Sequence, residues 1–173
     1  MTIEEKSRPA VLDCKRISWD EYFMEIARAS AKRASCFKKQ AGAVIVKNKQ
    51  ILSTGFNGAP RGVKDCFEKG ECMRQKDNVP SGTRLEYCMA THAEQNAIVQ
   101  AARSGVSIEG SALYTTVQPC VLCAKVIINA GIKEVVFEIP QKDFNKKQPL
   151  PESDLLAASL LEEAGVKVRQ WKK

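Results

Sequence analysis

Two stretches decide the fold and the chemistry predicted for this sequence: Thr91-His92-Ala93-Glu94 and Pro119-Cys120-Val121-Leu122-Cys123. Each stands where a helix is predicted to begin, with Thr91 as the N-cap of the first helix and Pro119 in the first turn of the second. A β-rich run over 112–117 lies between them. The centre of the chain is therefore predicted to be a helix, a strand and a helix, with both stretches at helix N-termini.

The rest of the chain extends this alternation on both sides. The pattern predicts a helix over 18–35, strands over 41–46 and 51–56 joined by a turn at 47–50, a segment without regular period over 57–87, a helix over 91–103, a strand over 112–117, a helix over 119–130, a strand over 134–139, a linker over 140–153, a helix around 155–161 and a strand over 166–169. This order predicts an α/β fold with a five-stranded mixed sheet and helices on both faces, giving three layers. We expect one domain over 18–173, after a polar arm over 1–17.

Composition narrows the class of protein. The chain has 173 residues, of which 44% are hydrophobic, and a mean hydropathy of −0.28, as in an ordinary globular domain. Apolar runs are too short for a membrane span and the first nine residues are polar and charged, so we expect a cytoplasmic protein without a membrane partner. The net charge of +7 favours anionic partners such as nucleotides, although a well-solvated basic surface would explain it equally.

The seven cysteines and the single histidine suggest a metal site. His92, Cys120 and Cys123 supply three ligands of the kinds that zinc prefers, and a catalytic zinc site typically has three protein ligands and one open position. Glu94 is placed to exchange protons with a water at that position. The alternative is a structural zinc clip completed by a fourth ligand elsewhere in the chain.

The H-x-E and P-C-x-x-C pair is the signature of zinc-dependent base deaminases. Between Ser35 and about Phe137 the sequence resembles the deoxycytidylate (dCMP) deaminase family, including its late-competence bacterial branch. The stretches that carry the resemblance are Gln40-Ala41-Gly42-Ala43-Val44-Ile45-Val46, Gly55-Phe56-Asn57-Gly58-Ala59-Pro60-Arg61-Gly62, His92-Ala93-Glu94-Gln95-Asn96-Ala97-Ile98 and Gln118-Pro119-Cys120-Val121-Leu122-Cys123-Ala124-Lys125.

This resemblance implies a cytidine-deaminase-like fold and hydrolytic deamination of dCMP to dUMP and ammonia. It implies that His92, Cys120 and Cys123 bind Zn²⁺ and that Glu94 is the general acid and base. Asn57 and the backbone at Ala93 and Gln118 would contact the substrate. The family also implies a homo-oligomer, commonly a hexamer, and regulation by dCTP and dTTP. The residues expected near these effectors are Gly58, Arg61, Gly62 and Arg103, of which Arg103 would equally serve as a solvated charge at a helix end.

Four further cysteines lie in or beside the segment 57–87: Cys36, Cys66, Cys72 and Cys88. Some members of the family carry a second, structural zinc there, and we expect most of these thiols to form such a site. The alternative is a set of small buried cysteines without a metal, and Cys14 is treated as incidental. The sequence departs from the family after the fourth strand, where Gln141 stands near the position of a usual tyrosine and Phe144 is the nearest aromatic residue.

Two other functions compete with this prediction. A tRNA adenosine deaminase shares the metal motif, but such enzymes have a much shorter segment between the asparagine and the histidine, so nucleic acid is not expected as the partner. A non-catalytic zinc protein, such as a nucleotide sensor or a DNA-uptake accessory protein, would have no use for Glu94. The sequence leaves open the choice between dCMP, dCTP and other cytosine nucleotides.

Overall fold

The computed structural model describes residues 16–80, 83–139 and 152–172. Its elements follow the predicted order, with the bounds α1 (Trp19–Ala31), β1 (Gly42–Lys47), β2 (Gln50–Phe56), α2 (Cys66–Lys69), α3 (Met73–Lys76), η1 (Leu85–Tyr87), α4 (Ala93–Arg103), β3 (Ala112–Val117), α5 (Val121–Asn129), β4 (Glu134–Ile139), α7 (Glu152–Glu163) and β5 (Lys167–Gln170). Cys14, Gln141 and Phe144 lie outside the described residues.

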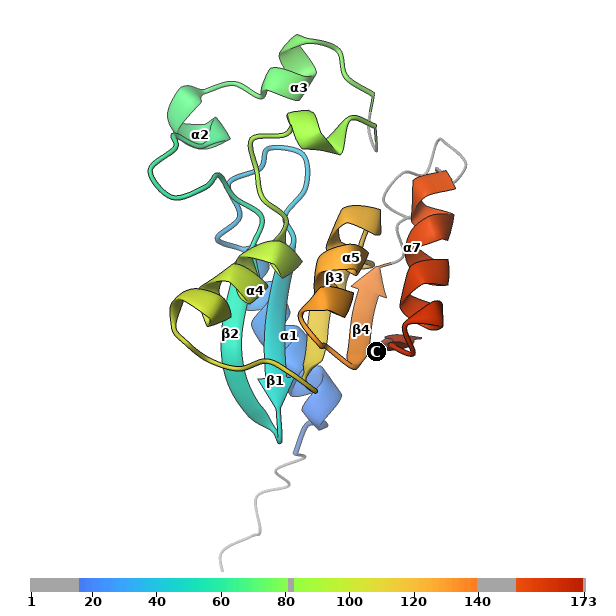
Figure 1. Ribbon diagram of the computed structural model, residues 1–173. Helices are drawn as coiled ribbons and strands as arrows, with labels where there is room; N and C mark the ends of the chain where they lie inside the picture. Colours follow the sequence, from blue (N-terminus) through green and yellow to red (C-terminus); the bar gives the residue numbers. More distant parts are fainter. Residues whose placement is uncertain (1–15, 81–82, 140–151, 173) are drawn as a thin grey trace, which may run out of the picture.

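The five strands form one mixed sheet in the order β2-β1-β3-β4-β5 (Figure 1). The central strand pair β1 and β3 is antiparallel, as is the hairpin of β1 and β2, whereas β3, β4 and β5 run parallel. The start of β1 and the carboxyl ends of β2, β3 and β4 therefore meet at one edge of the sheet. The predicted five-stranded mixed sheet is confirmed.

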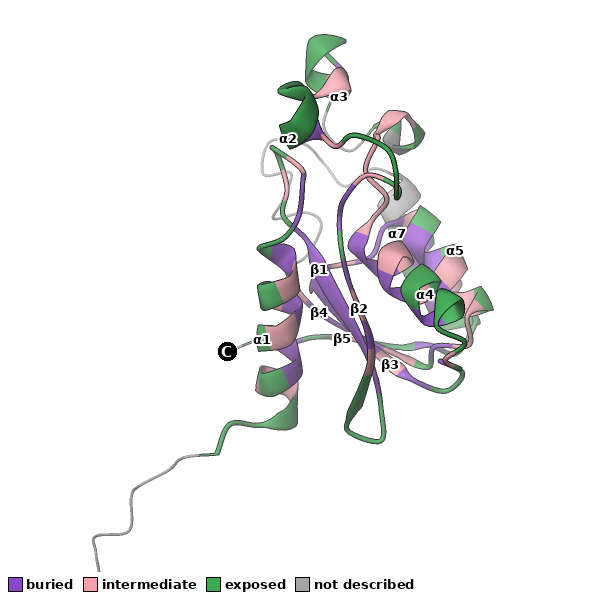
Figure 2. Cartoon of the chain, turned by 90° about the vertical axis from the view of Figure 1, so that its left-hand side faces the viewer, coloured by how far each residue is buried: buried purple, intermediate pink, exposed green. Residues whose placement is uncertain are grey.

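Helices cover both faces of the sheet, which confirms the three-layer arrangement (Figure 2). On one face α1 packs Phe23, Met24 and Ala27 against side chains of β1, β3 and β4. On the other face α4, α5 and α7 enclose a larger core that includes Ile45, Leu113 and many alanines of α4. Small side chains along α4 let this helix lie close to the sheet. Within the described residues no helix has the length and apolar character needed to cross a bilayer.

The hairpin turn follows the prediction from the sequence. Lys47 pairs with Gln50, which leaves Asn48 and Lys49 as a two-residue loop. Their φ angles are 51° and 63°, and positive values at both positions are what a type I′ turn requires. Asn48 tolerates this conformation because its short polar side chain reaches nearby backbone groups.

Three helix boundaries differ from the prediction. The first helix ends at Ala31 rather than near Ser35, because the Ser35 N–H donates to the carbonyl of Asn57 and draws the chain away from the helix axis. The N-cap of α4 is His92 rather than Thr91, and the N-cap of α5 is Cys120, so Pro119 precedes the helix. Two metal-ligand candidates therefore occupy cap positions.

The segment expected to lack regular structure contains the short helices α2, α3 and η1. A sequence signal for α2 was present, because Asp65 and Glu68 form a reciprocal capping box. Gly58 and Thr91 form an isolated antiparallel bridge, with N···O distances of 3.2 and 2.9 Å. This bridge joins the two ends of the insert 59–90, whose described parts, 59–80 and 83–90, stand above the sheet edge (Figure 1).

A polar network ties the last strand to the first helix. Both terminal nitrogens of Arg169 donate to the carboxylate of Asp20 at 2.7 Å, and its Nε donates to Glu134 at 2.7 Å. The Tyr114 hydroxyl also donates to Asp20, at 2.7 Å. The network thus joins α1, β3, β4 and β5 on the face that α1 covers.

Candidate functional site

The candidate site lies at the sheet edge where α4 and α5 begin. His92 caps α4, and the chain leaves β3 at Val117 to reach Cys120, which caps α5. Cys123 lies in the first turn of α5 and is fully buried. Two helix N-termini thus converge on one point, where their dipoles favour thiolate over thiol.

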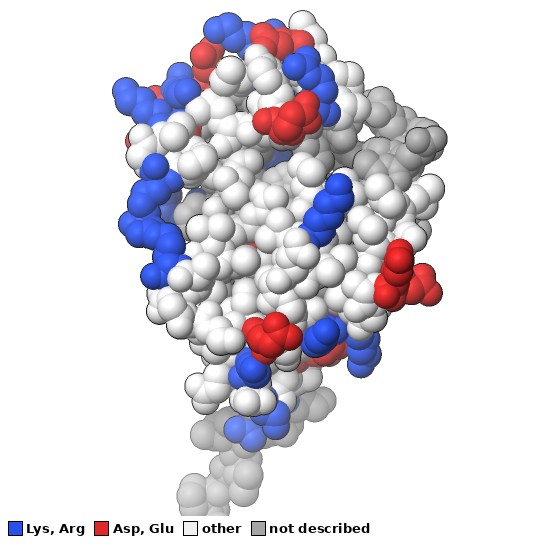
Figure 3. Space-filling view, in the orientation of Figure 1, with Lys and Arg blue, Asp and Glu red and all other residues white. Residues whose placement is uncertain are grey.

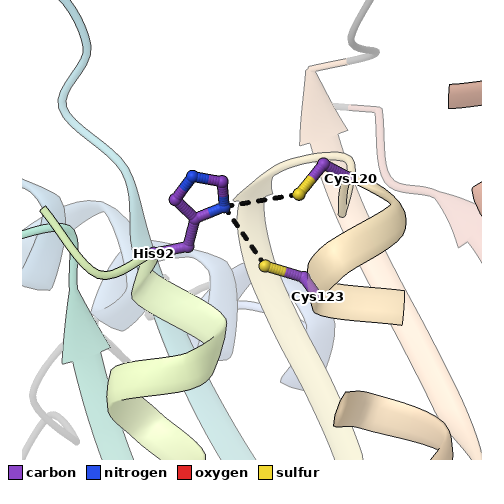
Figure 4. A group of neighbouring side chains, drawn as sticks. All are labelled: His92, Cys120 and Cys123. Atoms are coloured by element: carbon purple, nitrogen blue, oxygen red, sulfur yellow. Dashed lines mark hydrogen bonds between the residues drawn. The ribbon is translucent and has the colours of Figure 1, made fainter. Parts of the chain in front are cut away.

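The three predicted ligands meet there (Figure 4). His92 Nδ1 lies 3.3 Å from the Sγ atom of Cys123 and 3.4 Å from that of Cys120. Nitrogen and sulfur ligands on a tetrahedral zinc ion are about 3.5 Å apart, given the usual metal–ligand bond lengths. The donor set therefore fits zinc, with Nδ1 as the nitrogen ligand.

The pKa values of the two thiols shift in opposite directions. A hydrogen bond from Cys123, followed by one from His92, lowers the pKa of Cys120 to about 4 despite its burial. The bond to Cys120, together with burial, raises the pKa of Cys123 well above its ordinary value. The hydrogen bond to Cys120 also raises the pKa of His92. Two thiols and an imidazole that share hydrogen bonds in this way are a donor set suited to a cation, since metal ligands must be deprotonated.

Glu94 is buried beside these ligands, with a relative exposure of 5%. Burial raises its pKa, and the nearby charges of His92 and Lys39 partly counteract this effect. Over the described part of the chain, His92, Cys120 and Cys123 are the one group of potential ligands whose donor atoms all lie within 4.8 Å of one another. Glu94 is therefore near the site without belonging to its ligand set, the position expected of a proton carrier.

Asn57 is buried where β2 ends and is held by backbone groups. Its Oδ1 accepts from the Ala41 N–H at 2.7 Å, and its Nδ2 donates to the Lys39 carbonyl at 2.7 Å. One amide hydrogen and one lone pair remain for another partner. Gln118, whose N–H donates to the Ile139 carbonyl, and Ala93 in the first turn of α4 border the same edge.

A close approach of β2 and α4 sets the position of the His92 end of the helix. Ser53 Oγ donates to the Ala97 carbonyl at 2.9 Å, and Asn96 Nδ2 donates to the Phe56 carbonyl at 2.8 Å. Gly55 lies between these contacts, where its missing side chain leaves room for the helix backbone. The signal for this contact in the sequence is the glycine inside a strand.

The residues expected near effectors do not gather at one place in the single chain. Gly58 is buried in the bridge, whereas Arg61 and Gly62 are exposed in the insert, and Gly62 has a φ of 84°. Arg103 is exposed at the far end of α4, about 16 Å along the helix from His92.

Three of the four cysteines in or beside the insert, Cys36, Cys72 and Cys88, lie near the fourth, Cys66. Burial raises the pKa of Cys66 to about 11, and the charges of Cys72, Cys36 and Cys88 contribute to the increase. The neighbouring rings of Phe37 and Phe67 pack edge to face with centroids 4.7 Å apart. In the described residues these four sulfurs do not reach the close spacing of the ligands at His92.

Lys39 is a residue near the site that the sequence analysis did not single out. It is half-buried, and its charge is among those that act on both His92 and Glu94. In the sequence, the one indication was that Lys39 directly precedes the stretch Gln40-Ala41-Gly42. Its position relative to His92 depends on tertiary contacts, which the sequence does not reveal.

Comparison with known proteins points to one family. Residues 17–139 match the family described as the cytidine and deoxycytidylate deaminase zinc-binding region. The chain is 40% identical over 156 residues to a deoxycytidylate deaminase of Schizosaccharomyces pombe, covering 90% of this chain and 45% of that protein. It is 38% identical over 157 residues to ComE operon protein 2 of Bacillus subtilis, covering 90% of this chain and 72% of that protein.

The chain is also similar to a dCMP deaminase of known structure. The dCMP deaminase of cyanophage S-TIM5, solved with dCMP and dUMP, is 30% identical, with a TM-score of 0.67, covering 87% of this chain and 95% of that one. The chain spans about half the length of two yeast deoxycytidylate deaminases that it matches, 45% and 46%.

Proposed function

Because the chain belongs to the cytidine and deoxycytidylate deaminase family, we propose that it is a zinc-dependent hydrolase that converts dCMP and water into dUMP and ammonia. The observation that carries the proposal is the approach of His92 Nδ1 to the two sulfurs, at 3.3 and 3.4 Å, next to the buried Glu94. The similarity to deoxycytidylate deaminases over 90% of the chain supports dCMP as the substrate.

Each residue of the site has a defined task in this reaction. His92, Cys120 and Cys123 would hold the zinc ion, which when bound supplies a water acidic enough to lose a proton near neutral pH. A Glu94 Oε accepts that proton and delivers it to N3 of the cytosine ring. The water oxygen bonds to C4, and Glu94 then moves the proton of the new C4 hydroxyl to the 4-amino group, so that the C4–N bond breaks, a carbonyl forms at C4 and ammonia leaves. Burial keeps bulk water from competing for these protons.

The substrate is positioned by groups at the same edge of the sheet. Asn57 has a free amide hydrogen and a free lone pair for the sugar or the base. The backbone at Ala93 and Gln118 borders the place where the polar edge of the ring would lie. These roles are part of the proposal and follow from the motifs shared with the family.

A tRNA adenosine deaminase is the second candidate on this scaffold. On the face shown in Figure 3, basic and acidic side chains mix over the insert, and most of the central surface is uncharged. A nucleic-acid site usually shows a continuous basic stripe. On this face of the molecule, the distribution favours a small nucleotide over tRNA.

A substrate panel tests the proposal. Ammonia release from dCMP, dCTP, cytidine and tRNA is measured side by side with zinc-loaded protein. We expect turnover of dCMP well above that of the others. Turnover of tRNA without turnover of dCMP would overturn the proposal.

We further propose a second, structural zinc held by Cys36, Cys66, Cys72 and Cys88. The gathering of three thiols around Cys66 and the contact of Phe37 with Phe67 support it. Metal analysis should give two zinc ions per chain in the wild type and one in Cys66→Ser, while Cys14→Ser keeps both. One zinc per wild-type chain would exclude the second site.

The proposal also covers the oligomeric state of the protein, its regulation by nucleotides and its location in the cell. We propose one deaminase domain over 18–173 that follows an arm over 1–17 and assembles into a cytoplasmic homohexamer. In it, Gly58, Arg61, Gly62 and Arg103 would serve binding of dCTP or dTTP, with residues from different subunits brought together. Sedimentation and activity with and without each triphosphate test this arrangement, and a monomer indifferent to both would contradict it.

A further inference from the structure

The peptide group that leads into His92 is held at both of its polar atoms. Its oxygen, the Thr91 carbonyl, accepts from the Gly58 N–H at 3.2 Å and from Asn96 Nδ2 at 3.4 Å. Its N–H, which belongs to His92, donates to Gln95 Oε1 at 3.3 Å. Because the six atoms of a peptide group lie close to one plane, holding both polar atoms fixes the position of the next Cα atom. These contacts therefore set the backbone from which the imidazole of His92 extends.

The side chain of Asn96 also reaches the peptide group that leads into Asn57. Asn96 Nδ2 donates to the Phe56 carbonyl at 2.8 Å. The nitrogen of that peptide group, which belongs to Asn57, donates to the Ala41 carbonyl at 3.1 Å. A side-chain amide nitrogen carries two hydrogens, so Asn96 can bond both carbonyls at once. A single amide group thus joins the chain just before Asn57 to the chain just before His92.

The backbone that carries this amide group is itself held in place. The Asn96 N–H donates to the His92 carbonyl at 2.9 Å. The next residue, Ala97, is fully buried, and its carbonyl accepts from Ser53 Oγ of β2 at 2.9 Å. The first turns of α4 therefore lie fixed against β2, and the half-buried side chain of Asn96 extends from a fixed point.

We propose that Asn96 is a positioning residue, whose amide group holds the substrate-binding Asn57 and the metal ligand His92 in a fixed relative position. This inference rests on the proposed function, because it takes the tasks of Asn57 and His92 from it. Both hydrogens of the amide nitrogen are used within the chain, so Asn96 acts through placement rather than through contact with the substrate. Placement matters because a displacement of about 1 Å in an active site can lower the rate about 10²-fold.

Two variants remove the amide hydrogens in different ways. Asn96→Leu replaces the amide by an apolar group of similar size, and Asn96→Asp keeps the shape but lacks the N–H donors. Gln100→Leu is the matched control, because Gln100 is exposed one turn further along α4.

The first measurement is steady-state kinetics with dCMP, expressed per folded, zinc-loaded chain. Both Asn96 variants should lower kcat about tenfold to a hundredfold and change KM by less than about threefold, because alignment in the transition state is lost while the groups that bind the substrate remain. Gln100→Leu should behave as wild type. A loss confined to KM would overturn the inference, since it would indicate direct contact with the substrate.

The second measurement needs no turnover. Cobalt(II) is bound in place of zinc, and its visible absorption reports the arrangement of its ligands. Both Asn96 variants should bind cobalt with d–d bands that differ from those of the wild type in position or intensity, whereas the bands of Gln100→Leu should superimpose on them. Cobalt bound elsewhere contributes equally to all these proteins, so the difference reports the site at His92.

The two measurements separate this inference from the proposed function. If the wild type releases no ammonia from dCMP, the proposed function fails, and the cobalt spectra still decide the role of Asn96. If Asn96 served stability alone, its variants would unfold more easily but keep the wild-type spectrum and kcat, and that result would overturn the inference. Equal changes in Gln100→Leu would do the same. If Asn96→Leu does not fold, the isosteric Asn96→Asp decides the question.

Discussion

Gly55 of β2 lies against Ala93 of α4 so closely that a Cβ atom at Gly55 would meet the Ala93 carbonyl oxygen at 2.2 Å. The same Cβ would come within 2.4 Å of the Ala97 nitrogen. Both atoms belong to the helix backbone, which cannot rotate away as a side chain would. The absence of a side chain at Gly55 therefore allows the first turn of α4 to lie directly against β2.

Gly55→Ala should therefore shift the first turn of α4 and lower both stability and zinc affinity. Overpacking of this kind typically costs about 1–3 kcal/mol of unfolding free energy. Gly105→Ala is the matched control, because Gly105 has a positive φ of 65° but open space around it. That control should cost about 1 kcal/mol and retain zinc. Urea unfolding and metal analysis of both variants measure the difference, and full zinc retention in Gly55→Ala would contradict the steric argument.

Glu94→Gln should abolish most turnover while zinc content and dUMP binding remain. The amide keeps the shape of the carboxylate but cannot accept the proton, and loss of a general acid or base costs about 10²- to 10⁴-fold in kcat. Steady-state kinetics with dCMP measure this loss. Glu25→Gln, on the exposed side of α1, should be fully active. Retained turnover in Glu94→Gln would remove Glu94 from the mechanism.

The pH dependence of the reaction should report the burial of Glu94. Burial raises the pKa of this carboxyl group above its ordinary value of 4.5. Because the carboxylate is the form that accepts a proton, kcat/KM should fall as the pH drops through the raised pKa. An acid limb at or below 4.5 in the pH profile of kcat/KM would contradict a raised pKa of Glu94 in the zinc-loaded enzyme.

Cys123→Ser should lose the catalytic zinc, since a serine hydroxyl is a poor ligand for this ion at neutral pH. Activity and zinc content should fall together, with one zinc ion fewer per chain than in the wild type. Chelator treatment of the wild type followed by addition of zinc should restore activity, but the same addition should not restore the variant. Activity in Cys123→Ser without bound metal would refute a metal-dependent reaction.

Asp20→Asn should weaken the link between α1 and β5. The hydrogen bond from Arg169 lowers the pKa of Asp20 despite its partial burial, so this carboxylate stabilises the fold above the ordinary value of 3.8. The contribution should disappear as the pH falls through the lowered pKa. Both groups are about one-third exposed, and solvent screening limits the effect to about 1 kcal/mol.

Unfolding of wild type and Asp20→Asn at pH 7 and pH 3 measures this difference, which should be smaller at pH 3. Glu71→Gln removes a more exposed ion pair with Lys76 and should change stability by less than about 0.5 kcal/mol. A larger difference at pH 3 than at pH 7 would contradict the assigned direction of the pKa shift.

The strands of the core were the most predictable part of this fold. β3 and β4 have the bounds expected from the sequence, 112–117 and 134–139, because parallel strands buried on both faces appear as short apolar runs between turn residues. The helix starts were less predictable. Thr91 and Pro119 are good starting residues in isolation, but the chain places His92 and Cys120 at the caps, where their side chains face each other.

The ligand group was recognisable because each ligand belongs to a short motif with a chemical reason for its spacing. The position of Lys39 and the hydrogen bonds of Asn57 were not recognisable from the sequence. They depend on contacts between the segment that precedes β1 and the residue that follows β2. The helices of the insert were missed for another reason. Each of α2 and α3 has four residues, too few to show a helical period.

The bridge between Gly58 and Thr91 makes the position of α4 independent of the structure of the insert. Because the segments that enter and leave the insert pair with each other at its base, the 32 residues from 59 to 90 can change in length or sequence without altering where the helix at His92 begins. The insert is in this sense a module that is independent of the helix beginning at His92.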